Sequence, residues 1–121
     1  MVKSIPSQTG VDIDTVIHLD YGEETAHLQS AFRCKLHNHA YIIGEKGYID
    51  LPDFWRAREC HLYVHEQIVD SFKDERRGNG FEYEITSVSD DLLAGKLESP
   101  VVTHEVSMTL QRTLEEVRNQ F

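Results

Sequence analysis

The chain has 121 residues, of which 12 are basic and 21 acidic, so its formal net charge is −9 at neutral pH. This charge repels phosphate backbones and anionic bilayers, so neither nucleic acid nor a membrane is expected as a partner. No run of about eighteen apolar residues and no apolar signal core occur, which favours a cytoplasmic protein. At this length we expect a single domain, residues 1–121, around one core.

The first two thirds of the chain alternate between apolar and polar residues, as strands with one buried face do. Short turns separate the alternating segments, so neighbouring strands are expected to be antiparallel. Gly44 and Gly47 flank one turn, and both can adopt the positive φ angles that tight hairpin loops need. Cys34 and Cys60 fall within the alternation and are expected to be buried thiols. The predicted strands are residues 14–21, 25–35, 38–43, 48–51, 59–65 and 67–72. A charged, exposed link, residues 73–79, is expected to lead from the last strand to the first helix.

The last third, residues 80–120, predicts two amphipathic helices joined by an elbow at residues 95–100. Gly95 is expected to end the first helix in the left-handed conformation, and Thr103 to cap the second with its hydroxyl. The apolar stripes are Phe81, Ile85, Val88, Leu92 and Leu93 in the first helix, and Val106, Leu110, Leu114, Val117 and Phe121 in the second.

These elements together predict an α+β fold. We expect an open-faced antiparallel sheet of five to six strands, with the two C-terminal helices on one face. Because two helices cover only one face, the other is left to water or to a partner. Alternation places Ala31 on this open face with Thr25, His27, Gln29 and Arg33, and we expect a homodimer to form there.

Two stretches imitate functional motifs. His37 and His39 resemble the first two ligands of a small metal-binding β protein, but Glu45 is too far along the chain to complete the set. The segment 76–80, Arg-Arg-Gly-Asn-Gly, imitates a phosphate-binding glycine loop but lacks the third glycine and the surrounding βαβ unit. We therefore expect no metal site, and keep metal binding through the two histidines as an alternative.

The segment Pro52-Asp53-Phe54-Trp55-Arg56 is the strongest candidate for ligand contact. Its aromatic rings can stack on a sugar or arene, and its guanidinium can bind a hydroxyl or carboxylate. Trp55 and Arg56 are therefore candidates for ligand contact. The alternative is that Phe54 and Trp55 fill the end of the core.

Several motifs resemble the C-terminal part of a known family. They are Gly80, Phe81, Tyr83 and Glu84; Gly95, Glu98, Ser99 and Pro100; Leu114, Glu116, Val117 and Arg118; and the segment 44–49 followed by Pro52, Phe54 and Trp55. In these positions the chain resembles the glucose-fructose oxidoreductase, inositol dehydrogenase and MocA superfamily of NAD(P)-dependent oxidoreductases, above all its dihydrodiol dehydrogenase-like branch. The resemblance implies that Trp55, Arg56 and Phe81 lie near the substrate, and so predicts them as pocket residues.

The family's N-terminal Rossmann domain has no counterpart in the sequence, which contains neither a GxGxxG turn nor a Glu-Lys-Pro segment. The resemblance thus implies the C-terminal substrate-binding and oligomerisation domain of a larger dehydrogenase that acts on a sugar, polyol or related diol. We expect no catalytic or cofactor-binding residue here, no activity of the fragment alone, and NAD or NADP in the parent enzyme. Its expected partners are the missing Rossmann domain, the small-molecule substrate and a second copy. The other alternative is a stand-alone interaction module.

Overall fold

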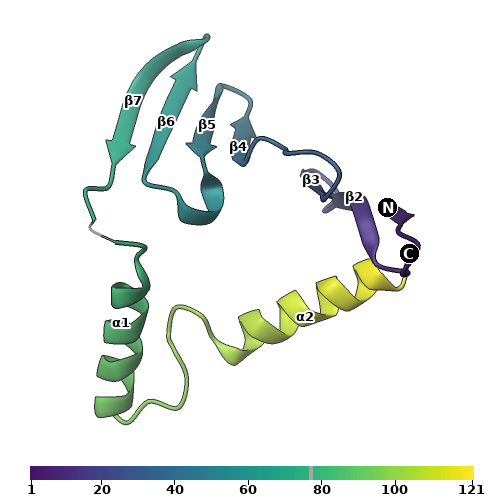
Figure 1. Cartoon of the computed structure of the whole chain (residues 1–121). Helices are drawn as coiled ribbons and strands as arrows, with labels where there is room; N and C mark the ends of the chain where they lie inside the picture. The colour runs from purple at the N-terminus through teal and green to yellow at the C-terminus, as the bar shows by residue number, and fades with distance from the viewer. Residues whose placement is uncertain (77) are drawn as a thin grey trace. The chain divides into compact units, whose positions relative to one another are not determined.

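A computed structural model describes residues 1–76 and 78–121 and divides the chain into two compact units (Figure 1). The terminal unit comprises Met1–Leu36 and Ala94–Phe121, and the central unit comprises His37–Leu93. The described residues form antiparallel strands and two α-helices, which confirms the α+β class.

The terminal unit contains a three-stranded antiparallel sheet in the order β1-β2-β3. Its strands are β1 (Val2–Pro6), β2 (Asp12–Asp20) and β3 (Thr25–Ala31). Ile17 lies opposite Leu28, which makes one face apolar, whereas His18 lies opposite His27 on the other face. Thr15 on the apolar face is buried and donates a 2.8 Å hydrogen bond to Oδ2 of Asp12.

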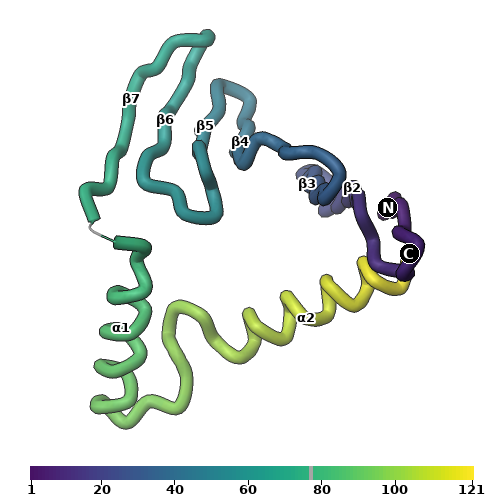
Figure 2. The backbone as a smooth tube through the Cα atoms, in the orientation of Figure 1, coloured from purple at the N-terminus to yellow at the C-terminus, as the bar shows by residue number. Residues whose placement is uncertain are grey.

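The central unit contains a four-stranded antiparallel sheet in the order β4-β5-β6-β7, whose successive hairpins Figure 2 traces. Its two faces differ in chemistry, because directly opposite residues share a face. Ile42, Ile49 and Leu62 meet on the apolar face, while Tyr41, Asp50 and His61 meet on the polar one. The strands are β4 (His39–Gly44), β5 (Gly47–Pro52), β6 (Glu59–Val64) and β7 (Gln67–Lys73), with the short 3-10 helix η1 (Phe54–Arg56) between β5 and β6.

The two helices form where the sequence predicts them, as α1 (Phe81–Leu93) and α2 (His104–Arg118). Oγ1 of Thr103 accepts a hydrogen bond from the Val106 amide, and Gly95 has a φ of +72°. The predicted cap at Thr103 and the predicted helix stop at Gly95 are both confirmed. Among the described helices, none is long and apolar enough to cross a membrane.

The helical stripes remain exposed apart from one residue. Among the described residues, Val117 of α2 is the only buried apolar side chain. Leu110 of α2 is 57% exposed and Ile85 of α1 is 65% exposed. α1 has no buried residue. Each helix therefore presents apolar surface that is open to a covering partner.

The expectation of one sheet with five to six strands is wrong, because seven strands form two sheets. β1 was not predicted; it pairs with β2 with Lys3 opposite Val16. β3 ends at Ala31, and the amide of Phe32 makes the final bond to Ile13. The alternation through residue 35 therefore has no strand opposite it, because β2 begins at Asp12.

Two further expectations are corrected. Gly44 and Gly47 do not adopt positive φ; a side chain at Gly47 would instead collide with Tyr63 of the neighbouring strand. Cys34 is an exposed free thiol beyond β3, and Cys60 in β6 is half-buried, so neither is the fully buried thiol that alternation suggested.

Candidate functional site

A pocket of about 410 Å³ lies at one end of the central sheet. It is built from the end of β5, η1, the start of β6, the end of β7 and the segment before α1. Four cationic side chains line it, an unusual concentration in a chain whose net charge is −9. The lining residues are Pro52, Asp53, Arg56, Arg58, Glu59, Lys73, Arg76, Gly78 and Asn79.

Arg76 is fixed in the pocket wall by the backbone of the η1 segment. Its Nη2 donates hydrogen bonds to the carbonyl oxygens of Arg56, at 2.9 Å, and Ala57, at 2.7 Å. Its Nε lies 3.4 Å from Oδ2 of Asp74, and its side chain is only 19% exposed. These contacts hold the guanidinium in one place and join η1 to the chain beyond β7.

Arg58 is a second arginine of the pocket lining. Its Nη2 donates to the carbonyl oxygen of Gly78, and its own carbonyl accepts a 2.6 Å bond from the Asp74 amide. Lys73 stands opposite Glu59 in the β6-β7 register. The cations thus come from two stretches of the chain, residues 56–58 and 73–76, which the β6-β7 pairing brings together.

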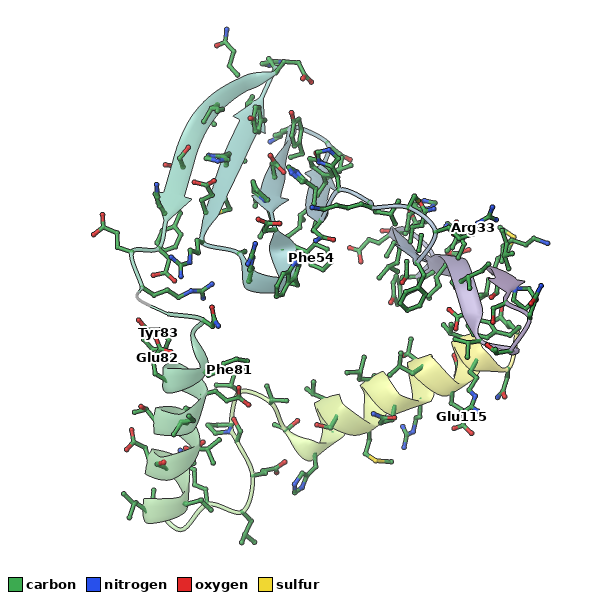
Figure 3. All side chains as sticks on the ribbon, viewed as in Figure 1. Arg33, Phe54, Phe81, Glu82, Tyr83 and Glu115 are labelled. Atoms are coloured by element: carbon green, nitrogen blue, oxygen red, sulfur yellow. The ribbon has the colours of Figure 1, made fainter. Side chains whose placement is uncertain are left out.

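Trp55 and Arg56 lie together at the rim. The guanidinium carbon of Arg56 is 4.7 Å from the Trp55 ring centroid, a cation-π distance, and Nη2 of Arg56 is 3.7 Å from Oδ2 of Asp53. Trp55 is 62% exposed, and Phe54, labelled at η1 in Figure 3, is 53% exposed. Neither ring is enclosed in a core, as the alternative interpretation would require.

The structure places only one of the three predicted pocket residues in the pocket lining. Arg56 lines it and Trp55 touches Arg56, but Phe81 lies at the start of α1, 66% exposed (Figure 3). Sequence reasoning missed Arg58, Lys73 and Arg76. The signal in the sequence for Lys73 and Arg76 was the predicted charged link, residues 73–79. Residue 77 of that link lies outside the described residues.

The polar face of the central sheet forms a second, more open cluster. Nδ1 of His39 is 3.1 Å from Oδ1 of Asp50, and the rings of Tyr48 and Tyr63 stack with centroids 4.7 Å apart. Desolvation by its neighbours raises the pKa of Tyr48 above its usual value, and the nearby charge of Glu66 raises it further.

The metal alternative gains no support from this cluster. The ring centroids of His37 and His39 are 5.6 Å apart. In the part of the chain that the structure describes, no three His, Cys, Asp or Glu residues gather as a metal site requires. Among the described residues, the two histidines therefore have no third ligand beside them.

The chain is similar to two curated frog proteins that share one name. It is 30% identical to trans-1,2-dihydrobenzene-1,2-diol dehydrogenase of Xenopus tropicalis over 98% of this chain and 38% of that protein. It is 31% identical to the protein of the same name from Xenopus laevis over 93% of this chain and 36% of the relative. The chain thus spans somewhat over a third of the length of these relatives. No protein-family model matches it.

Proposed function

We propose that this chain supplies the substrate-side and association part of an NAD(P)-dependent oxidoreductase that acts on a diol, sugar or polyol. The observation that carries the proposal is the similarity to two diol dehydrogenases across almost all of this chain. The exposed Trp55 and Arg56 suit the role, because an aromatic ring can stack on a cyclic diol while a guanidinium donates to its hydroxyls. Phe81 is proposed to join them when the substrate is bound.

The proposal can be tested with the chain itself, because Trp55 is the only tryptophan. Titration with trans-1,2-dihydrobenzene-1,2-diol is expected to change the Trp55 fluorescence in a saturable manner, with a Kd of about 1–10 mM for so small a ligand. Arg56→Ala is expected to weaken binding about tenfold, and Arg112→Ala, a matched arginine on α2, to leave it unchanged. A response that stays linear with ligand, or that Arg112→Ala alters equally, argues against the substrate role.

Nicotinamide binding is expected to need residues outside this sequence. A dinucleotide is held by a glycine-rich turn in a βαβ unit, and these 121 residues contain no such fingerprint. Calorimetric titration of the chain with NADH and with NADPH is therefore expected to give only heats of dilution. A Kd in the micromolar range for either cofactor would refute this part of the proposal.

Self-association is proposed through the open face of the terminal sheet. Thr25, His27, Gln29 and Ala31 share that face, and their small or neutral side chains suit an interface better than a solvated surface. The residues of β2 opposite them are Asp20, His18, Val16 and Asp14, so two carboxylates lie at the ends of the face. Arg33, which was expected beside them, lies beyond the end of β3.

Sedimentation at tens of micromolar is expected to give about twice the 14.0 kDa chain mass. Ala31→Glu should produce a folded monomer, because it places two buried charges across a two-fold axis. Gln8→Glu, which adds the same charge in the β1-β2 turn, serves as the control. A monomeric wild-type chain, or a dimer that tolerates Ala31→Glu, contradicts the proposed interface.

A further inference from the structure

We propose that the pocket at the end of the central sheet is a binding site for a small oxyanion, either a carboxylate or a phosphate group. Its lining contains four cations, Arg56, Arg58, Lys73 and Arg76, but only two carboxylates, Asp53 and Glu59. Two further carboxylates lie outside the lining: Asp74 beside Arg76, and Glu82, whose Oε1 would lie 3.5 Å from a Cβ at Gly78. Cationic groups therefore outnumber the acidic groups that face the pocket.

The arrangement is preorganised, because two guanidinium groups donate to backbone carbonyls, and of the two Arg76 also lies beside a carboxylate, that of Asp74. Arg76 donates to the carbonyls of Arg56 and Ala57, and Arg58 donates to that of Gly78. A carbonyl acceptor orients a guanidinium without neutralising its charge. Since each guanidinium carries five N–H donors, donors remain for a ligand after these bonds form.

The acidic residues leave the pocket attractive to an anion. Asp53 interacts with Arg56 at the rim across 3.7 Å, and both side chains are more than half exposed, so this pair is weakly held. Glu59 and Lys73 face each other across the edge of the sheet. Arg58 and Arg76 therefore supply the fixed positive charge, while Arg56 and Lys73 can close on the ligand.

The size of the pocket agrees with this ligand class. A volume of about 410 Å³ accommodates a carboxylate or phosphate with a small organic group attached. Trp55, which is not itself a lining residue, stacks on Arg56 of the lining. The inference depends on the charge and geometry of the pocket, so it can hold whether or not the chain belongs to an oxidoreductase.

The site is tested by titrating the isotope-labelled chain with sodium phosphate and, separately, sodium acetate, with total ionic strength kept constant by sodium chloride. The amide signals of Gly78 and Asn79 are expected to shift saturably, with a Kd below about 10 mM for at least one anion. Saturation by phosphate alone assigns a phosphate-bearing ligand, and saturation by acetate assigns a carboxylate.

Lys73→Gln is the variant of choice, because Lys73 is exposed on the edge strand β7 and its loss should leave the fold intact. It is expected to weaken anion binding at least fivefold, and Arg58→Gln at least tenfold. Lys46→Gln in the β4-β5 turn removes the same charge elsewhere and should have no effect. The proposal is overturned if neither anion saturates, or if Lys46→Gln and Lys73→Gln weaken binding equally. If the unsubstituted chain binds an anion but not the diol, only the oxidoreductase proposal is contradicted.

Discussion

Replacing Gly47 by alanine is expected to lower the free energy of unfolding by about 3 kcal/mol, a large part of a small domain's stability. An added Cβ would lie 2.1 Å from the carbonyl oxygen of Tyr63 and 3.2 Å from Cγ2 of Val64. The first distance is far inside van der Waals contact with a backbone atom. β5 and β6 would have to separate, which breaks hydrogen bonds in the middle of the sheet. Urea unfolding followed by circular dichroism measures the loss.

Gly44→Ala is the matched control, because Gly44 belongs to the same hairpin. A Cβ there meets only the Gly47 carbonyl oxygen, at 3.8 Å, and its backbone has no positive φ. The change in unfolding free energy should stay within about 0.5 kcal/mol. If the two variants lose the same stability, the close approach of β6 is not what requires glycine at position 47.

This glycine illustrates what the sequence could predict and what it could not. The β4-β5 hairpin follows from two alternating segments around a Gly-Glu-Lys-Gly turn, because turn chemistry is local. The reason for the second glycine lies in Tyr63, sixteen residues away on another strand. No local pattern reveals which strand will approach so closely, so positive φ was the expected reason.

The division into two sheets was also beyond local pattern. Alternation continues past Ala31 through Phe32 and Cys34, but a strand exists only where a partner offers hydrogen bonds. Ala31 of β3 pairs with Asp14, and β2 begins at Asp12, so β2 offers no further residues with which β3 could pair. The helices, in contrast, were predictable, since the Thr103 cap and the Gly95 stop depend on neighbouring residues alone.

The candidate site was predictable to the same limited extent. Trp55 and Arg56 are adjacent in sequence, and their loop composition pointed to ligand contact. The contact of Arg76 with the carbonyl of Arg56 joins residues twenty positions apart, so it required the fold. The segment 73–79 was expected to be an exposed charged link, yet the side chain of Arg76 is largely enclosed in the pocket wall.

Replacing Arg76 by alanine is therefore expected to destabilise the central unit by about 3 kcal/mol. The substitution removes two charge-assisted hydrogen bonds and leaves the carbonyl oxygens of Arg56 and Ala57 without that donor. It also removes the cation beside the partly enclosed carboxylate of Asp74, 3.4 Å away. Hydrogen exchange of the β6 and β7 amides, measured with urea unfolding, locates the loss.

Arg56→Ala provides the comparison, because it removes the same charge from the same pocket. Arg56 is 59% exposed and its ion pair with Asp53 spans 3.7 Å, so its loss should cost less than about 1 kcal/mol. Arg76→Lys is expected to recover only part of the stability, since a single ammonium does not reproduce the planar fork that reaches both carbonyls. Equal losses for Arg76→Ala and Arg56→Ala would show that the η1 segment is held in place by other contacts. Arg76 would then act through its charge alone.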